Sequence, residues 1–151
     1  MPITLREITR ENWMQCVQLT VASEQDHFVA SNAFSLAQSK YEPEWVPLAL
    51  YGDTEMVGFV MYGLYREEGK YWILRVMVDR RFQGKGYGHA AMRLLLDRLR
   101  AIPGCDEVAI SYEPENDVAR RLYASFGFRE TGEIIEGETV ARLSFGAASL
   151  P

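Results

Sequence analysis

Residues 83–88, with the sequence Q-G-K-G-Y-G, carry the pattern with the clearest chemical meaning in this chain. They lie between an apolar, β-branched run over 73–78 and a run with helical spacing over 89–100. Glycine has no Cβ, so the backbone can turn sharply and approach a ligand closely. The start of the helix then offers unpaired N–H groups and a partial positive charge. The segment therefore predicts a phosphate-binding loop between a strand and a helix.

The spacing of the glycines narrows the kind of phosphate ligand. Dinucleotide-binding loops have G-x-G-x-x-G, whereas the glycines here stand at 84, 86 and 88. The Walker pattern G-x-x-x-x-G-K-[ST] does not occur in the sequence. What remains is Q-x-x-G-x-G after a strand. A β–α connection without a ligand is the alternative, but so many glycines would destabilise such a connection without a compensating role.

A second pattern, N-x-x-A-x-x-x-Y-x-x-x-G-F, begins at Asn116. Asn116 opens a predicted helix, where its amide can cap the helix and also bind a ligand. Ala119 leaves room for another group to approach, and Tyr123 lies on the same helical face as Asn116. Gly127 ends the helix. An ordinary helix with an asparagine cap and a core tyrosine is the better explanation of the pattern when it is taken alone, but the glycine loop upstream favours the ligand-binding interpretation.

The elements that must position these residues follow from hydrophobic spacing. Alternating or short apolar runs predict strands over 3–8, 47–51, 55–65, 71–78, 107–112, 129–135 and 139–145. Helical spacing and capping residues predict helices over 9–21, 31–41, 89–99 and 116–126. The order β-α-α-β-β-β-α-β-α-β-β predicts an α/β fold with a mixed sheet and helices on both faces. We expect one domain over 1–146 and a short C-terminal tail over 147–151.

The apolar face of each helix gives its expected core contacts. In the first helix these are Trp13, Cys16, Val17 and Val21. In the second helix they are Phe34, Leu36, Ala37 and Tyr41. In the third helix they are Ala90, Leu94, Leu95 and Leu99. Within the third strand, Gly58 and Gly63 predict a bulge or a bend.

Both patterns and the order of elements resemble the GCN5-related N-acetyltransferases, the GNAT superfamily. Q-G-K-G-Y-G resembles the coenzyme A pyrophosphate loop of that family, and the pattern from Asn116 resembles its second cofactor motif. The element order matches the GNAT fold along nearly the whole chain. The resemblance implies an N-acetyltransferase that uses acetyl-CoA, with a sheet that opens between the strands over 71–78 and 107–112 to admit it.

The resemblance also implies a role for each cofactor residue. The pyrophosphate would bind to the loop and the first helical turn, formed by Gln83, Gly84, Lys85, Gly86, Tyr87, Gly88 and His89. The main chain of Val76, Met77 and Val78 would pair with the pantetheine arm and the thioester carbonyl, and Asn116 would bond to the pantetheine. Tyr123 would be the catalytic acid that protonates the departing thiolate. Ordinary pKa values of about 10 for Tyr and about 8.5 for a thiol make that transfer nearly matched.

The base that removes a proton from the acceptor amine has no clear position in the sequence. An amine with a pKa of about 10 is protonated at pH 7 and must lose a proton before it attacks. Relatives commonly use a carboxylate acting through water, but the strand over 71–78 contains no Asp or Glu. Ser111 stands where many relatives have Glu. Glu113, the nearest acidic residue at the end of the strand over 107–112, is the candidate catalytic base. Alternatively, Glu113 is an exposed carboxylate in a loop without a catalytic role.

Two segments, 21–32 and 56–63, are similar to bacterial spermine/spermidine N-acetyltransferases of the short GNAT type. This resemblance implies that the connection between the first two helices borders the acceptor site. The candidate polyamine-binding residues there are Glu24, Asp26, Tyr41 and Glu42, with Glu44 and Trp45 beside them. Spaced carboxylates and aromatic faces suit a flexible polycation. Alternatively, these charged residues belong to a solvated loop that binds no substrate. Another amine (an amino acid, an aminoglycoside or a protein N-terminus) and a non-catalytic acyl-CoA-binding module remain alternative functions.

Composition bounds the remaining classes. The chain has 151 residues, a net charge of −5 and two cysteines in no metal or redox spacing. A mildly acidic chain argues against a nucleic-acid-binding surface, which needs clustered Lys and Arg. The N-terminal residues do not form a signal-peptide pattern, and no apolar stretch is long enough to span a membrane. We expect a cytoplasmic enzyme for a small-molecule amine, with no metal, nucleic-acid or membrane partner, and a homodimer is one assembly open to it.

Overall fold

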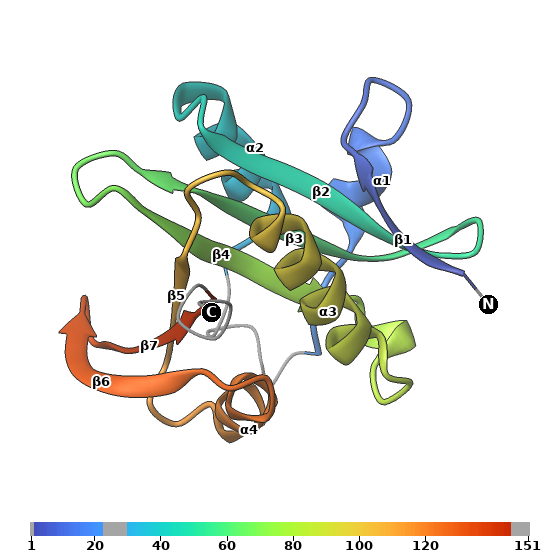
Figure 1. Ribbon diagram of the computed structural model, residues 1–151. Helices are drawn as coiled ribbons and strands as arrows, with labels where there is room; N and C mark the ends of the chain where they lie inside the picture. Colours follow the sequence, from blue (N-terminus) through green and yellow to red (C-terminus); the bar gives the residue numbers. More distant parts are fainter. Residues whose placement is uncertain (1, 23–29, 146–151) are drawn as a thin grey trace.

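The computed structural model describes residues 2–22 and 30–145, and the predicted tail over 147–151 lies outside them. Among the described residues, seven strands form one sheet in the order β1-β2-β3-β4-β5-β7-β6 (Figure 1). The strands are β1 (Ile3–Glu7), β2 (Trp45–Gly52), β3 (Glu55–Tyr65), β4 (Lys70–Val78), β5 (Glu107–Tyr112), β6 (Arg129–Ile135) and β7 (Glu138–Ser144). Neighbouring strands are antiparallel except β4 and β5, which are parallel. The predicted mixed α/β sheet is confirmed.

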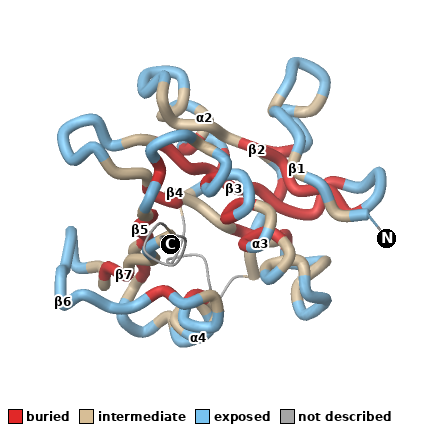
Figure 2. The backbone as a smooth tube through the Cα atoms, viewed as in Figure 1, coloured by how far each residue is buried: buried red, intermediate tan, exposed pale blue. Residues whose placement is uncertain are grey.

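Helices cover both faces of the sheet, as predicted. They are α1 (Trp13–Gln18), α2 (Asn32–Tyr41), α3 (Tyr87–Arg100) and α4 (Asp117–Ser125), with a short 3-10 helix η2 (Arg80–Phe82) before α3. Alternation along β2 shows the two faces: Leu48 and Leu50 pack with α3 and α4, whereas Ala49 and Tyr51 pack with α1. The central strands β2 to β5 contain long buried stretches, and the edge strand β6 is exposed (Figure 2). No helix in the described part of the chain is long and apolar enough to cross a bilayer.

The first helix is shorter than the sequence predicts. A helix is expected over 9–21, but α1 spans only Trp13–Gln18. After it, the Thr20 N–H donates to Asp79 Oδ1 (2.9 Å), and the Thr20 carbonyl accepts from the Arg80 N–H (2.8 Å). These bonds to the end of β4 replace the bonds that would continue the helix, so the chain leaves α1 early.

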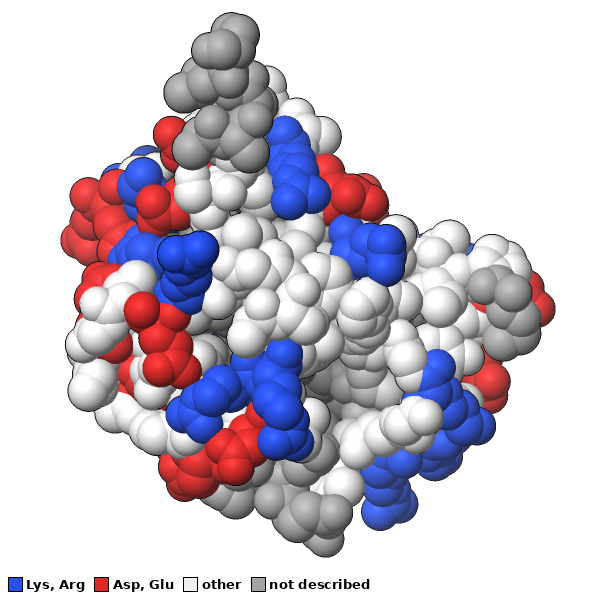
Figure 3. All heavy atoms as spheres, turned by 60° about the horizontal axis from the view of Figure 1, so that its bottom comes forward, with Lys and Arg blue, Asp and Glu red and all other residues white. Residues whose placement is uncertain are grey.

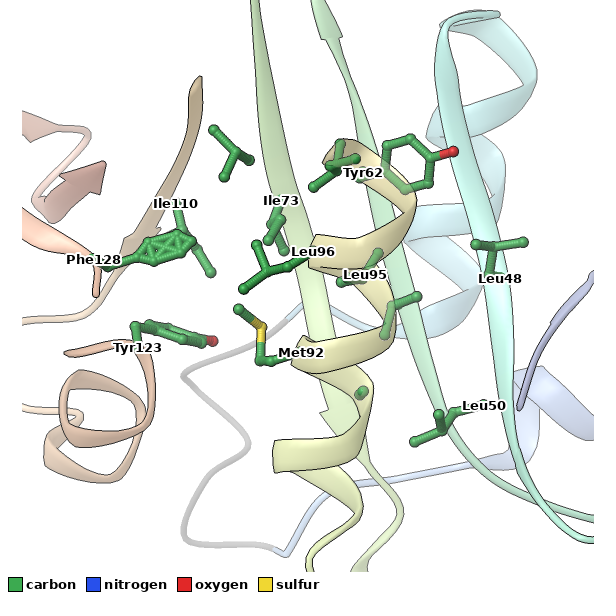
Figure 4. Packing of buried hydrophobic residues seen from close by; sticks show 14 of the residues in the cluster. Leu48, Leu50, Tyr62, Ile73, Met92, Leu95, Leu96, Ile110, Tyr123 and Phe128 are labelled. Carbon is green, nitrogen blue, oxygen red and sulfur yellow. The ribbon is translucent and has the colours of Figure 1, made fainter. Parts of the chain in front are cut away.

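The buried faces of the helices differ in part from the prediction. Cys16 is buried as expected, but Trp13, Phe34 and Tyr41 are 44%, 55% and 77% exposed. In α2 the buried contacts are polar, because Asn32 is buried and donates from Nδ2 to the Cys16 carbonyl (2.9 Å). The buried stripe of α3 includes two of the predicted residues and consists of Ala91, Met92, Leu95, Leu96 and Leu99 (Figure 4).

The predicted irregularity in the third strand is present. The register between β2 and β3 shifts between the pairs Leu50↔Gly58 and Tyr51↔Met56, so Val57 is an extra residue beside Gly58. Gly58 has no room for a side chain, since a Cβ there would come within 2.5 Å of the Met77 carbonyl oxygen. The close approach of β3 to β4 therefore requires glycine at this position.

Candidate active site

β4 and β5 pair only over their first residues. Their parallel register ends at Ile73↔Ile110, and among the described residues the β5-facing edge of β4 over 74–78 has no strand partner. Leu74 is an extra residue opposite β3 at the same point, which bends β4. The two strands diverge in Figure 1, and a cleft of about 810 Å³ lies in this opening. An extended ligand can add to the free edge of β4 as another strand would.

The loop before α3 has the geometry of an anion site. Gly84 and Gly86 have φ angles of +79° and +87°, the left-handed conformation that favours glycine. Gly86 is the N-cap of α3, and its carbonyl accepts the first intrahelical bond, from the Ala90 N–H (3.1 Å). The N–H groups of residues 87–89 therefore have no intrahelical acceptor and point out of the N-terminus of the helix. A pyrophosphate that entered the cleft would find these donors and the positive end of the helix dipole.

Side chains fix this loop to the end of β4. Asp79 is 2% exposed, and its carboxylate accepts from the Thr20 N–H (2.9 Å), the Arg81 N–H (3.1 Å) and Arg81 Nε (2.7 Å). Burial would raise the pKa of Asp79, but these hydrogen bonds and the charge of Arg81 outweigh burial and lower it. Gln83 donates from Nε2 to the Val78 carbonyl (2.9 Å) and closes the turn.

Of Lys85, Tyr87 and His89, only Tyr87 lines the cleft. Tyr87 lines it and lies over Gly52, where a Cβ would come within 2.7 Å of the Tyr87 hydroxyl oxygen. Lys85 and His89 are exposed and do not line it, and the His89 ring packs on Phe126 with centroids 4.6 Å apart. Figure 3 shows Lys and Arg side chains, with Asp and Glu side chains between several of them, around an uncharged surface on the face that includes α4. Cations there would attract an anionic donor such as coenzyme A.

Asn116 and Tyr123 face the cleft from the α4 side. Asn116 Oδ1 accepts from the Ala119 N–H (3.2 Å) and caps α4, so its amide Nδ2 is the group left to meet a ligand. Tyr123 is 8% exposed, and its hydroxyl has no hydrogen bond to a described residue. Among the described residues, every fully buried polar side-chain atom has a hydrogen-bond partner, so the unpaired Tyr123 hydroxyl is not fully buried. The hydroxyl therefore contacts the cleft, and Figure 4 shows it pointing from α4 toward α3.

The surroundings of Tyr123 keep it protonated and in place. Burial raises the pKa of Tyr123, and Tyr112 and Glu138 raise it further. The Tyr112 ring lies 5.6 Å from the Tyr123 ring, and its hydroxyl donates to Glu130 Oε2 (2.7 Å). Arg120 on α4 donates from Nε to the same Glu130 oxygen (3.0 Å), which ties α4 to the sheet. Tyr123 therefore keeps its proton until negative charge develops beside it.

The other end of the cleft lies toward α2 and the tips of the sheet. Three aromatic rings line it, with Trp45 stacked on Tyr65 (5.6 Å) and Tyr65 stacked on Trp72 (5.3 Å). Two carboxylates of the β6–β7 hairpin, Glu136 and Glu138, also line it. The same cleft therefore connects the glycine loop and Tyr123 with a site that has acidic and aromatic walls.

Arg75 lines this second end and contacts only neutral groups. Its guanidinium donates to Ser35 Oγ (3.0 Å), the Leu74 carbonyl (2.8 Å) and Gln38 Oε1 (2.7 Å), and it forms no ion pair with a described carboxylate. Burial lowers the pKa of Arg75, and the negative charge of Glu138 opposes that shift. Arg75 is thus a partly buried cation at this second end of the cleft.

Those predicted acceptor residues that the structure describes do not line the cleft. Glu24 and Asp26 lie outside the described residues, and Tyr41 and Glu42 do not line the cleft. Beside them, Glu44 forms an exposed ion pair with Arg66 (2.7 Å). The cleft instead contains Trp45 from this group, together with Arg75, Glu136 and Glu138, which the sequence did not single out.

The predicted base, Glu113, does not line the cleft either, and its carbonyl accepts from the Asn116 N–H (2.9 Å). Ser111, where many relatives have Glu, instead donates from Oγ to Glu138 Oε1 (2.7 Å). Ser111 in place of Glu is the sequence signal that could have prompted a search for another carboxylate. The sequence does not show which distant strand supplies it. The predicted cofactor residues that line the cleft fit their roles by position, and these roles stay predictions: Val76, Met77, Val78, Gln83, Gly84, Gly86, Tyr87, Gly88, Asn116 and Tyr123. The predicted roles of Lys85 and His89 have no such support, since neither residue lines the cleft.

Comparisons with known proteins agree with this geometry. Residues 5–128 match the family model described as Acetyltransferase (GNAT) family. The chain is 33% identical over 147 residues to the spermine/spermidine N(1)-acetyltransferase of Bacillus subtilis (strain 168), covering 93% of this chain and 97% of that protein. It is 32% identical over 80 residues to human N-acetylaspartate synthetase, covering 53% of this chain and 26% of that protein.

A solved structure with the same fold is the spermidine N-acetyltransferase from Vibrio cholerae in complex with CoA and spermine. The TM-score is 0.73 with 17% identity, and the match covers 93% of this chain and 92% of that chain. Because the family model matches most of the sequence, the chain belongs to the GNAT family of acetyltransferases and is an acetyl-CoA-dependent N-acetyltransferase.

Proposed function

We propose that this N-acetyltransferase acetylates a primary amine of a polyamine such as spermidine or spermine. The observation that carries the proposal is the acceptor end of the cleft, where Glu136 and Glu138 lie with the stacked rings of Trp45, Tyr65 and Trp72. Carboxylates attract the separate ammonium groups of a polyamine, and aromatic surfaces suit both its cations and its methylene spacers. The spermine/spermidine N(1)-acetyltransferase of Bacillus subtilis, which is similar over almost the whole chain, supports the same acceptor.

The arrangement of the cleft accounts for acetyl transfer by direct attack. Acetyl-CoA supplies an activated acetyl group as a thioester. The glycine loop and the first turn of α3 would hold its pyrophosphate, and the free edge of β4 over 74–78 would hold its pantetheine arm. The thioester would then lie in the opening between β4 and β5, between Tyr123 on one side and the proposed acceptor end on the other. Tyr123 then donates a proton to the departing thiolate.

A specific observation favours a second class of acceptor. Arg75 is a cation at the acceptor end without a carboxylate partner among the described residues. A guanidinium in this state suits an amine that also carries a carboxylate, such as an amino acid. The partial similarity to human N-acetylaspartate synthetase points the same way. An amino acid is therefore the second candidate acceptor.

Release of free CoA thiol across a panel of amines distinguishes these acceptors. We expect spermine and spermidine to give higher kcat/KM than butylamine, an aminoglycoside or aspartate. The KM for spermidine should rise steeply with salt, because the Debye length falls to about 3 Å at 1 M, while the KM for butylamine should change little. Fastest turnover of aspartate would favour the amino-acid candidate. Turnover of no amine, with acetyl-CoA still bound, would instead indicate a binding module. The homodimer and the cytoplasmic location stay predictions.

A further inference from the structure

We propose that Glu138 is the general base of acetyl transfer and that Ser111 is its positioning residue. The proposal rests on the proposed function, since it concerns how an amine acceptor loses its proton. It assigns the base to the start of β7, a strand that lies outside both cofactor motifs.

The position of Glu138 meets the geometric requirement for a base. It lines the cleft, and Ser111 Oγ donates to its Oε1 (2.7 Å). Ser111 directly follows Ile110, the residue at which β5 stops pairing with β4, so this hydrogen bond holds the carboxylate at the opening of the sheet. The second oxygen, Oε2, has no hydrogen bond to a described residue and can accept a proton. A base must lie within hydrogen-bond reach of the proton, directly or through one water.

The charged and titratable groups around Glu138 come from three elements among the described residues. Arg75 on β4 and Glu136 in the same hairpin line the cleft together with Glu138, and the negative charge of Glu138 acts on the Arg75 guanidinium. Tyr123 on α4 also lies within its field, since the charge of Glu138 contributes to the raised pKa of that phenol. The carboxylate and the phenol therefore face one cleft. This is the pairing that a base and an acid need.

No other described carboxylate has this position. Glu113 does not line the cleft, and Glu130 is engaged by Tyr112 (2.7 Å) and Arg120 (3.0 Å). Glu136 lines the cleft at the tip of the hairpin, where its φ angle of +50° places it in the turn. Of these four, only Glu138 is held against β5 by a side-chain hydrogen bond.

The proton transfers balance as follows. Glu138 takes one proton from the ammonium group of the acceptor, directly or through a water. The neutral nitrogen attacks the thioester carbon, a C–N bond forms, and the C–S bond breaks. Tyr123 gives its proton to the departing sulfur and recovers one from the newly bonded nitrogen through water. Glu138 then releases its proton to solvent, so that acyl donor and ammonium become amide, thiol and one proton.

The test compares three isosteric variants of the full chain with the best amine from the panel. Glu138→Gln should lower kcat/KM at pH 7 by about 10²-fold or more, the usual contribution of a general base. Its rate should recover as pH rises toward the pKa of the amine, because the acceptor then loses its proton in solution. Glu115→Gln is the matched control, since Glu115 is exposed and outside the cleft. Glu113→Gln tests the rival base.

Ser111→Ala keeps the carboxylate and removes its hydrogen bond, so it should lower kcat less than Glu138→Gln and leave the pH profile of wild type. Unchanged acetyl-CoA binding by calorimetry and an unchanged melting temperature show that each variant is folded. Wild-type kcat and pH profile in Glu138→Gln would overturn the assignment while leaving the proposed function intact, as would a large loss in Glu113→Gln. Absence of transfer to any amine by the wild-type enzyme would instead reject the proposed function, and the base with it.

Discussion

Alanine at Gly86 and at Gly88 should have opposite effects on the stability of the enzyme without ligand. Gly86 has a φ angle of +87° and caps α3. An L-residue in this left-handed conformation costs about 1–2 kcal/mol. Gly88 is inside α3 with an ordinary helical backbone, and a Cβ there would lie 3.9 Å from Leu122 Cδ2 and 4.0 Å from Val78 Cγ2. Those are ordinary contacts, so Gly88→Ala should gain the helix propensity of alanine, up to about 1 kcal/mol.

The two variants should therefore differ by about 1–3 kcal/mol in the free energy of unfolding. For a chain of this size, each kcal/mol shifts the melting temperature by about 2–4 °C. Urea and thermal unfolding of the ligand-free variants measure the difference directly. Gly86→Ala should also weaken acetyl-CoA binding in calorimetry, because it misplaces the N–H groups of residues 87–89. If Gly88→Ala destabilised the enzyme as much as Gly86→Ala, the distinction between a conformational glycine and a tolerant one would be refuted.

Two further predictions concern Tyr123 and Asp79. Tyr123→Phe should retain acetyl-CoA binding and lower kcat by about 10²-fold or more, because the buried phenol faces the cleft and keeps its proton; unchanged kcat at saturating substrate would show that Tyr123 only packs. Because the pKa of Asp79 is lowered in the folded state, its stabilising effect should be present above the ordinary Asp pKa of about 3.9 and be lost as pH falls through the folded value. Urea midpoints between pH 6 and pH 3 should show wild type losing its advantage over Asp79→Asn toward acid, and a constant difference would contradict the role of the carboxylate.

The sequence by itself determined the parts of this enzyme that depend on neighbours along the chain. The strand and helix order, the Asn116 cap and the left-handed turn at Gly84 and Gly86 are local properties, so glycine spacing and hydrophobic periodicity predict them. The bounds of β5 and β6 agree with the structure for the same reason. Where a distant partner intervenes the prediction is wrong, as in α1, which ends early because Thr20 bonds to Asp79.

The side chains that meet at the proposed acceptor end come from segments far apart in the sequence, so their meeting depends on the fold. Ser111 and Glu138 are 27 residues apart, and they meet because β5 pairs with β7 in a register that places Ser111 opposite Val140. Arg75 reaches Gln38 across 37 residues because β4 lies beside α2. The polar side chains involved have no periodicity that shows which distant residue they face, since strand register is set by packing of the whole sheet. The local pattern therefore predicts the donor site, whereas the fold brings together the carboxylates and the cation at the proposed acceptor end.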